Sequence, residues 1–383
     1  MLIKGLTIYA EDNVIEQGYI KITNGKIESV GKANDVTDTD TIQFPNTYKC
    51  LPGMIDVHIH GAQGADTMDA SSTALDTISN ALPQEGTTSY LATTITQQHS
   101  NIEQALSNVG SYINVQPAGQ AEILGIHLEG PFINQEKAGA QPYDYIIDGD
   151  ISLFKKWQKL SGENIKLVTL APEIKNGIAL TKYLNSNGVV ASIGHSNATY
   201  NQVVKAIHVG ASHITHLFNG MSGLHHREIG VAGAALMRDE LFVEMIVDGI
   251  HICPEMVQLA YHSIGKERTI LVTDAMRAKC LKGGVYDLGG QNVTVSNSKA
   301  TLDDGALAGS LLTMDQAMRN MLTYTDATLG DLTTITSKNP AKQCGVFDRK
   351  GSIKENKEAD LIILDEHNNL VMTICRGAIS YER

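Results

Sequence analysis

The sequence predicts an α/β protein: a (β/α)8 TIM-like barrel with a small β-sandwich domain formed by the N- and C-terminal segments. Eight short, continuous apolar runs recur through the middle of the chain, and alternating apolar and polar residues occupy both ends. The sequence has no GxGxxG motif after the first apolar run, which argues against a Rossmann fold. We expect the small β domain at residues 1–50 and 346–383 and the barrel at residues 51–345.

The eight apolar runs predict the strands of the barrel. They span residues 55–60, 89–94, 122–129, 165–173, 189–195, 213–218, 242–251 and 269–275. Continuous apolar runs are typical of strands that are covered on both faces, as in parallel sheets. Amphipathic stretches between them, such as residues 75–86, 197–210 and 254–265, predict helices. Eight strand–helix units favour a closed barrel over an open, doubly wound sheet.

Both ends of the chain predict short antiparallel strands. Residues 2–10, 19–31 and 40–50 alternate apolar and polar side chains, with Asn24-Gly25 as a turn. Residues 351–353 and 359–383 resemble them, with Asn368-Asn369 as a turn. Two helical stretches, at residues 310–325 and 329–345, lead from the last apolar run back to these strands. The two ends are therefore expected to form one domain.

Charge and composition exclude several classes of function. The 383 residues carry 30 Lys and Arg against 42 Asp and Glu, a net charge of −12, without a basic run. Nucleic acid is therefore not an expected partner, because phosphate neutralisation needs clustered basic residues. The absence of an 18-residue apolar stretch and of an N-terminal signal predicts a cytoplasmic protein with no membrane contact. Scattered positions predict free thiols for Cys50, Cys253, Cys280, Cys344 and Cys375.

Polar residues gather at the C-terminal tips of the predicted barrel strands. They are His58, His60, Glu129, His195, His216, Asp248, His251 and Asp274. In a barrel these tips converge on one mouth, which is where barrel enzymes keep their active sites. The sequence therefore places its candidate site at that mouth.

These residue types predict a hydrolytic metal site. Imidazole nitrogens and carboxylate oxygens suit Zn²⁺, Fe²⁺, Co²⁺ or Mn²⁺. His58 and His60 lie on one face of a strand, because side chains alternate with period two, so this pair could take one ion. Glu129, His195 and His216 would hold a second ion or share the first. Asp274, on the last strand, is the expected proton shuttle beside the activated water.

Several longer motifs show a resemblance to a known family. They are PGMIDVHIHG (52–61), HLEGPF (127–132), GHSNAT (194–199), THLFNGMSGLHHREIG (215–230), VDGIH (247–251), TDAM (273–276), NPAK (339–342) and KGSIKENKEADLIILD (350–365). In these motifs the chain resembles the amidohydrolase superfamily through nearly its whole length. HLEGPF and the stretch around LHHRE resemble the deacetylase branch in particular.

The resemblance implies an activity and an assembly. It implies a metal-dependent hydrolase, with one or two divalent ions per subunit, that converts N-acetyl-D-glucosamine 6-phosphate to D-glucosamine 6-phosphate and acetate. That reaction belongs to amino-sugar catabolism and cell-wall recycling. It also implies a homodimer, in which Arg227 reaches the site of the neighbouring subunit.

The resemblance also assigns roles residue by residue. Glu129, His195 and His216 match the main metal ligands, His58 and His60 match the pair that binds a second ion in some members, and Asp274 matches the catalytic carboxylate. The implied substrate-binding residues are Ala140, Gln141, Asn219, Gly220, Arg227, Asp248, His251, Leu307, Ala308 and Gly309. Members often have His at the place of Gln141. The fourth run ends without a lysine for carboxylation, which leaves Glu129 as the bridging or sole carboxylate.

Two alternatives remain open at this point. Another amidohydrolase, a cyclic amidase or a deaminase, would keep the metal-binding histidines but has no need of HLEGPF or the Arg227 loop. A non-catalytic scaffold on the same fold would be expected to lose ligands, whereas every ligand position here is matched.

Overall fold

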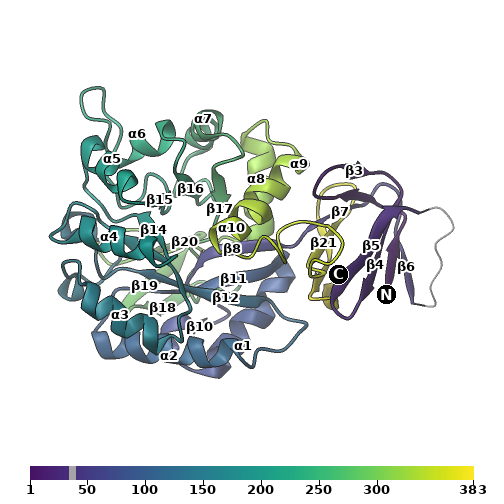
Figure 1. Ribbon diagram of the computed structural model, residues 1–383, viewed down its shortest axis with the longest axis horizontal. Helices are drawn as coiled ribbons and strands as arrows, with labels where there is room; N and C mark the ends of the chain where they lie inside the picture. The colour runs from purple at the N-terminus through teal and green to yellow at the C-terminus, as the bar shows by residue number, and fades with distance from the viewer. Residues whose placement is uncertain (34–39) are drawn as a thin grey trace.

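The computed structural model describes residues 1–33 and 40–383. A barrel with helices around it forms the larger part of the molecule, and two sheets that contain both chain ends lie at one side of it (Figure 1). The N- and C-terminal segments therefore lie together at one side of the barrel, as the alternating patterns at both ends predict.

An eight-stranded parallel sheet forms the barrel. Its strands are β8 (Met54–Ile59), β11 (Thr87–Thr94), β12 (Glu122–Glu129), β13 (Ile165–Leu170), β14 (Val190–Ile193), β15 (Ala211–Ile214), β16 (Phe242–Met245) and β17 (Thr269–Leu271). They pair in sequence order, and a bridge between Ile59 and Ala275, just beyond β17, brings the first strand beside the last. All eight predicted strands are confirmed, and β11 and β12 are buried along their whole length.

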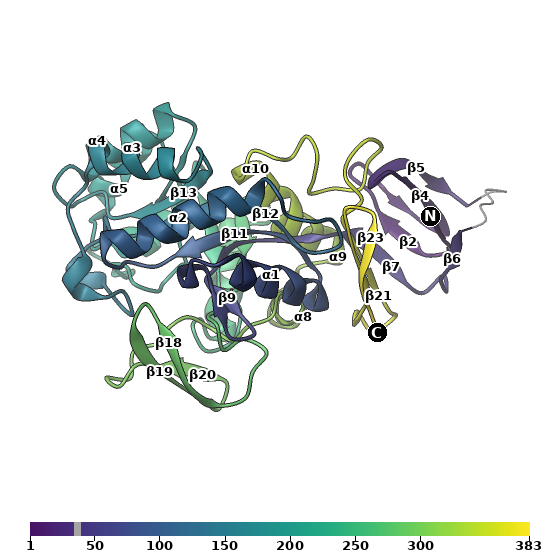
Figure 2. The same cartoon turned by 90° about the horizontal axis from the view of Figure 1, so that it is seen from below.

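Helices cover the outside of the barrel (Figures 1 and 2). They are α1 (Ser72–Ala81), α2 (His99–Ile113), α3 (Ile151–Leu160), α4 (Gly177–Ser186), α5 (Tyr200–His208), α6 (Gly230–Met237), α7 (Pro254–Ile264) and α8 (Met314–Tyr324). Local sequence signals set several of their starts. Thr199 and Gln202 form a capping box at α5, and Pro254 occupies the first position of α7, where its missing N–H costs nothing.

Two sheets at the side of the barrel combine the chain ends. One has the order β5-β4-β1-β6, and the other has the order β23-β22-β21-β7-β2-β3. Their strands are β1 (Leu2–Lys4), β2 (Thr7–Tyr9), β3 (Val14–Ile15), β4 (Gly18–Thr23), β5 (Lys26–Lys32), β6 (Thr41–Gln43), β7 (Lys49–Pro52), β21 (Leu361–Leu364), β22 (Leu370–Cys375) and β23 (Ala378–Glu382). The second sheet pairs β7 with β21, so strands whose paired residues are 309 to 315 positions apart share one layer.

Three other segments with regular structure lie outside the barrel strands, the helices around them and the two terminal sheets. After α8, the helices α9 (Leu329–Thr333) and α10 (Asn339–Gln343) flank a π-helical turn at Thr334–Lys338 and lead to β21. A two-stranded hairpin, β9 (Gly61–Ala62) and β10 (Ala65–Asp66), follows β8. A three-stranded antiparallel sheet, β18 (Gly284–Leu288), β19 (Gln291–Ser296) and β20 (Lys299–Thr301), projects from the barrel beyond β17 (Figure 2).

One expectation about secondary structure was wrong, and one sheet was not predicted. Residues 351–353 form no strand: Gly351 and Ser352 are bends, and the backbone oxygen of Ile353 accepts a hydrogen bond from the backbone N–H of Glu11. The sheet β18–β20 was not predicted, although Gly289-Gly290 and Asn297-Ser298 are turn signals that separate its alternating strands. None of the helices among the described residues combines the length and the apolar composition needed to cross a membrane.

Candidate active site

Six side chains meet at the C-terminal mouth of the barrel. His58 lies in β8 and Glu129 is the last residue of β12, whereas His60, His195, His216 and Asp274 follow the ends of β8, β14, β15 and β17. Because parallel strands end at the same rim, residues from five strands converge there. Six of the predicted site residues therefore come together, although they are up to 216 positions apart.

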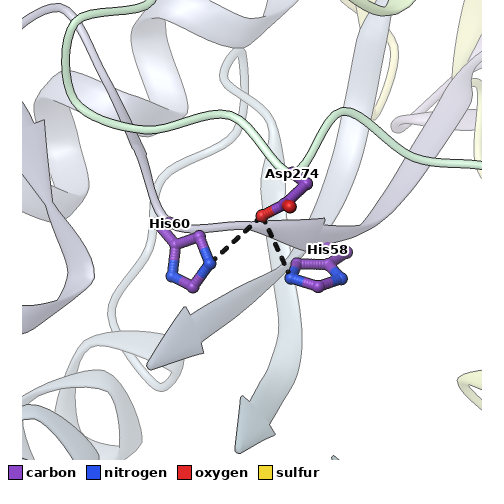
Figure 3. A group of neighbouring side chains, drawn as sticks. All are labelled: His58, His60 and Asp274. Atoms are coloured by element: carbon purple, nitrogen blue, oxygen red, sulfur yellow. Dashed lines mark ion pairs between the residues drawn. The ribbon is translucent and has the colours of Figure 1, made fainter. Parts of the chain in front are cut away.

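One group of candidate ligands consists of His58, His60 and Asp274. The Nε2 atoms of both histidines lie 3.3 Å from Oδ1 of Asp274. Figure 3 shows both rings directed at that single carboxylate oxygen. The three ligand atoms lie within 4.8 Å of one another, and all three residues are buried.

A second group consists of Glu129, His195 and His216. The Nε2 atoms of both histidines lie 3.2 Å from Oε1 of Glu129, and they lie 3.1 Å from each other. These ligand atoms also lie within 4.8 Å of one another. The fold therefore supplies two adjacent sets of three ligands.

Glu129 lies between the two groups and contacts both. Its Oε1 is 3.4 Å from Nε2 of His58, and its Oε2 is 3.3 Å from Nε2 of His60. Gln141 holds this carboxylate in place, because its Nε2 donates to Oε2 of Glu129 at 2.8 Å while its Oε1 accepts from the backbone N–H of Thr96. A carboxylate in this position can serve one ion or bridge two.

Three of these residues have unusual backbone conformations. The φ angles are 46° at His195, 32° at His216 and 47° at Asp274, in the left-handed region that L-residues rarely adopt. Such conformations concentrate at functional sites, where the surrounding structure enforces them. At the three positions the sharp turn after the strand aims the side chain into the mouth.

The electrostatics of the cluster favour added positive charge. Burial lowers the pKa of His58, but the charges of Asp274, Glu129 and Glu244 outweigh this effect and raise it well above its usual value. Burial also lowers the pKa of His60, but hydrogen bonds to Asp274 and Glu129 outweigh this effect and raise that pKa to about 9. Burial would raise the pKa of Glu129, yet the neighbouring histidines hold it well below its usual value. Bound cations would likewise stabilise the negative charge of these buried carboxylates.

The donor set fits a divalent metal ion. Within residues 1–33 and 40–383, Nε2 of His58 has no hydrogen-bond partner although it is buried among ligand atoms. The Nε2 atoms of His195 and His216 lie 3.1 Å apart, and both lie 3.2 Å from Oε1 of Glu129. Nitrogen and carboxylate donors in this arrangement suit Zn²⁺, Fe²⁺, Co²⁺ or Mn²⁺.

A pocket of about 270 Å³ opens over the cluster. Its lining includes seven of the predicted substrate-binding residues: Ala140, Gln141, Asn219, Gly220, His251, Leu307 and Gly309. Asp248 lies behind it and accepts a hydrogen bond from Nδ1 of His251 at 2.7 Å. Ala308 is fully buried next to the lining.

Arg227, like His58, Asp248 and Ala308, is not among the residues that line the pocket, but it alone of these four is exposed. It occupies an exposed loop, where its Nη1 lies 2.7 Å from Nε2 of His226. None of the described residues that line the pocket is a lysine or an arginine. The described lining of the pocket therefore offers no lysine or arginine side chain to an anionic substrate.

Sequence reasoning missed several residues at the site. Ile95, Leu288 and Ala306 line the pocket, the last two from or beside the unpredicted sheet β18–β20. Glu244 and His213 lie beneath the cluster, where Nε2 of His213 and Nδ1 of His58 each lie 3.0 Å from an oxygen of Glu244. The signal for Glu244 is a charged residue inside the apolar run at residues 242–251.

Comparisons with known proteins agree with this geometry. The model of the Amidohydrolase family matches residues 50–379. The chain belongs to the amidohydrolase family. This amidohydrolase is 49% identical over 384 residues to the N-acetylglucosamine-6-phosphate deacetylase of Bacillus subtilis (strain 168), covering 100% of this chain and 97% of the relative. The resemblance found in the motifs is thereby confirmed, and the protein is a hydrolase.

Two further relatives of this amidohydrolase are informative. The crystal structure of N-acetylglucosamine-6-phosphate deacetylase from Thermotoga maritima superposes with a TM-score of 0.91 at 35% identity and 100% coverage of both chains, which confirms the predicted fold class. An N-acetylgalactosamine-6-phosphate deacetylase of Escherichia coli O157:H7 is 33% identical, with 95% of each chain covered.

Proposed function

We propose that this amidohydrolase hydrolyses N-acetyl-D-glucosamine 6-phosphate to D-glucosamine 6-phosphate and acetate. The observation that carries the proposal is the position of Asp274: its carboxylate belongs to one of two adjacent groups of candidate metal ligands and lines the pocket above them. The 49% identical relative bears the name of this activity, and the alternatives of a cyclic amidase or a scaffold have no comparable support.

The reaction would use a divalent ion held by Glu129, His195 and His216, with His58 and His60 available for a second. Such an ion lowers the pKa of water to near 7 and polarises a carbonyl oxygen. We propose Zn²⁺, Fe²⁺, Mn²⁺ or Co²⁺, one or two per subunit, because imidazole and carboxylate ligands suit all four.

Asp274 would move the proton in both halves of the reaction. Burial would raise the pKa of Asp274, but the charges and hydrogen bonds of His58 and His60 outweigh it and lower that pKa. The ionised form of this carboxylate is the one that can accept a proton. It would take the proton of the attacking water and return it to the leaving amine nitrogen, which completes amide hydrolysis.

Polar groups of the pocket would orient the sugar. Nε2 of Gln141 donates one of its two hydrogens to Glu129, which leaves the other for the acetyl carbonyl oxygen. Asp248 fixes the ring of His251 by accepting from Nδ1, which leaves Nε2 for a sugar hydroxyl. The backbone around Asn219 and Gly220 would contact the phosphate, with Leu307 to Gly309 closing the opposite side of the pocket.

A second copy of the chain would complete the phosphate-binding site. A phosphate dianion is bound most strongly by charge-assisted hydrogen bonds from arginine or lysine. The described residues of one chain that line the pocket include neither. Arg227 is exposed on its loop. We therefore propose a homodimer in which Arg227 of the partner subunit binds the phosphate, acting in the cytoplasm, where phosphorylated sugars are retained.

Acetate release from three sugars tests this proposal. The metal-loaded protein should cleave N-acetyl-D-glucosamine 6-phosphate with a higher kcat/KM than it cleaves either of two comparison sugars. One is the unphosphorylated sugar, N-acetyl-D-glucosamine, and the other is N-acetyl-D-galactosamine 6-phosphate, the epimer of the proposed substrate. The epimer is a necessary comparison because a 33% identical relative is named for it. Equal or faster cleavage of either comparison sugar would overturn the substrate assignment.

A further inference from the structure

We propose that Glu244 is a positioning residue that orients His58 and thereby sets how tightly the metal position of His58, His60 and Asp274 binds its ion. The inference rests on the proposed function only for the presence of metal, and it concerns a residue outside both ligand groups.

Glu244 is fully buried in β16, beneath the mouth of the barrel, and three N–H groups face its carboxylate. Oε2 accepts from Nδ1 of His58 at 3.0 Å and from the backbone N–H of His216 at 3.1 Å. Oε1 accepts from Nε2 of His213 at 3.0 Å. One carboxylate therefore contacts a residue of each ligand group.

The contact with His58 fixes which ring nitrogen faces the ions. An ionised carboxylate only accepts, so Nδ1 of His58 carries the hydrogen and Nε2 keeps its lone pair. Nε2 is the atom that lies 3.3 Å from Asp274 and 3.4 Å from Glu129. On its other side, the ring of His127 packs edge-on against His58 with centroids 4.5 Å apart. The side chain of His58 is thus held from two directions.

The other candidate histidine ligands are oriented differently. Among the described residues, Nδ1 of His60 and Nδ1 of His216 have no hydrogen-bond partner, and Nδ1 of His195 contacts the backbone oxygen of Lys137 at 2.8 Å. His58 is therefore the ligand whose orientation depends on a carboxylate. Partners of this kind raise ligand basicity, and losing one typically costs about 10–100-fold in metal affinity.

The effect of Glu244 should fall on one metal position more than on the other. His216 is held through its backbone, and the adjacent Leu217 N–H also bonds to the backbone oxygen of Glu244, a contact that survives side-chain replacement. The contact of Glu244 with His58 is made to the ring, through Nδ1. Loss of the carboxylate should therefore weaken the position of His58, His60 and Asp274 and spare that of Glu129, His195 and His216.

Metal titration of Glu244→Gln tests this inference. A glutamine has one acceptor oxygen and an NH₂ group, so it cannot accept from all three N–H groups. In equilibrium titrations of the metal-free protein with Zn²⁺, the wild type should bind two ions. Glu244→Gln should bind the first ion normally and the second about 10–100-fold more weakly. Glu244→Asp, which keeps the charge but falls one methylene short, should show the same selective loss and serves if the glutamine variant does not fold.

Two controls separate positioning from general damage. Glu85→Gln removes another buried carboxylate, one that pairs with Lys279 and contacts no candidate ligand, so it should lower stability and keep two ions. In a His58→Ala background, Glu244→Gln should cause no further loss of metal, because its effect passes through His58.

Several outcomes would overturn the inference. In Glu244→Gln, they are an unchanged affinity for the second Zn²⁺ or an equal loss of affinity for both ions. In the His58→Ala background, the contradicting result is a further loss of metal affinity on adding Glu244→Gln. A wild type that never binds more than one Zn²⁺ would also overturn it. Acetate release is measured separately on the wild type. A protein that binds two ions and shows the expected Glu244 effect but releases no acetate would overturn the proposed function and leave the role of Glu244 standing.

Discussion

The Nε2 atoms of His195 and His216 face each other at 3.1 Å in the mouth of the barrel. Two imidazoles gain nothing from this approach unless a proton or a cation lies between their lone pairs. Oε1 of Glu129, at 3.2 Å from both, completes a set of three donors. The arrangement is explained when all three bind one ion, because each then supplies a lone pair to the same centre.

Replacement of His195 should remove this ion. In His195→Ala the ion loses a ligand, so elemental analysis of the purified variant should find most of the metal at this position gone, with acetate release lost in parallel. His208→Ala is the matched control, because His208 is exposed at the end of α5 and should keep full metal and activity. Full metal content in His195→Ala would show that the assignment is wrong.

Replacement of Asp274 should separate binding from turnover. Asp274→Asn keeps the size of the side chain but cannot accept a proton, so kcat should fall by about 10²–10⁴-fold while KM for N-acetyl-D-glucosamine 6-phosphate stays within a few-fold. Steady-state kinetics on a variant with verified metal content provide the measurement. Near-normal turnover would exclude Asp274 as the proton-transfer group.

Arg227 should act across the dimer interface. Arg227→Ala should lose about 10-fold or more of the preference for the phosphorylated sugar, since a charge-assisted bond contributes about 1.5–3 kcal/mol. Refolding a mixture of Arg227→Ala and Asp274→Asn chains should restore activity, because the mixed dimer has one site with an intact Asp274 and a partner's arginine. Activity no higher than the sum of the separate variants would contradict a shared site.

Glu11 should stabilise the joined chain ends in a pH-dependent way. Burial opposes the shift, but hydrogen bonds from Lys354, Ser352 and Lys357 lower the pKa of Glu11 from 4.5 to about 2. The stabilisation is therefore full above pH 4.5 and is lost as the pH falls toward 2. With solvent screening, Glu11→Gln should cost about 1–2 kcal/mol at pH 7 and less at pH 3.

Urea unfolding of the wild type and the variant at both pH values measures this difference. Asp12→Asn is the control, since Asp12 is exposed and its carboxylate lies 3.6 Å from Nζ of Lys354. A Glu11→Gln penalty that does not shrink at low pH would show that the carboxylate charge is not responsible.

The barrel could be predicted because its strands are buried on both faces. The run at residues 122–129 reads as continuous apolar sequence since both sides of β12 meet other side chains, and its bounds match the strand. The sheet β18–β20 could not be placed in this way. Its strands lie outside the repeating strand–helix units and form no continuous apolar run: β18 is largely exposed, and β19 alternates buried and exposed residues.

The ligand positions were predictable because the C-terminal tips of parallel strands must meet. Glu244 and His213 were not, because their role depends on a register between β15 and β16 that places both side chains on the inside of the barrel. Arg227 illustrates a different limit. Its sequence motif points to phosphate, but its exposed loop lies away from the pocket of its own chain, and no pattern within one chain gives the position of a second copy.

Removal and return of the metal test whether deacetylation depends on a bound ion. The wild type is freed of metal with a chelator, and acetate release from N-acetyl-D-glucosamine 6-phosphate is measured as Zn²⁺ is added back. We predict that metal-free protein stays folded with activity lost, and that activity returns in proportion to the bound ion. Full deacetylation by folded, metal-free protein would show that the reaction needs no bound ion.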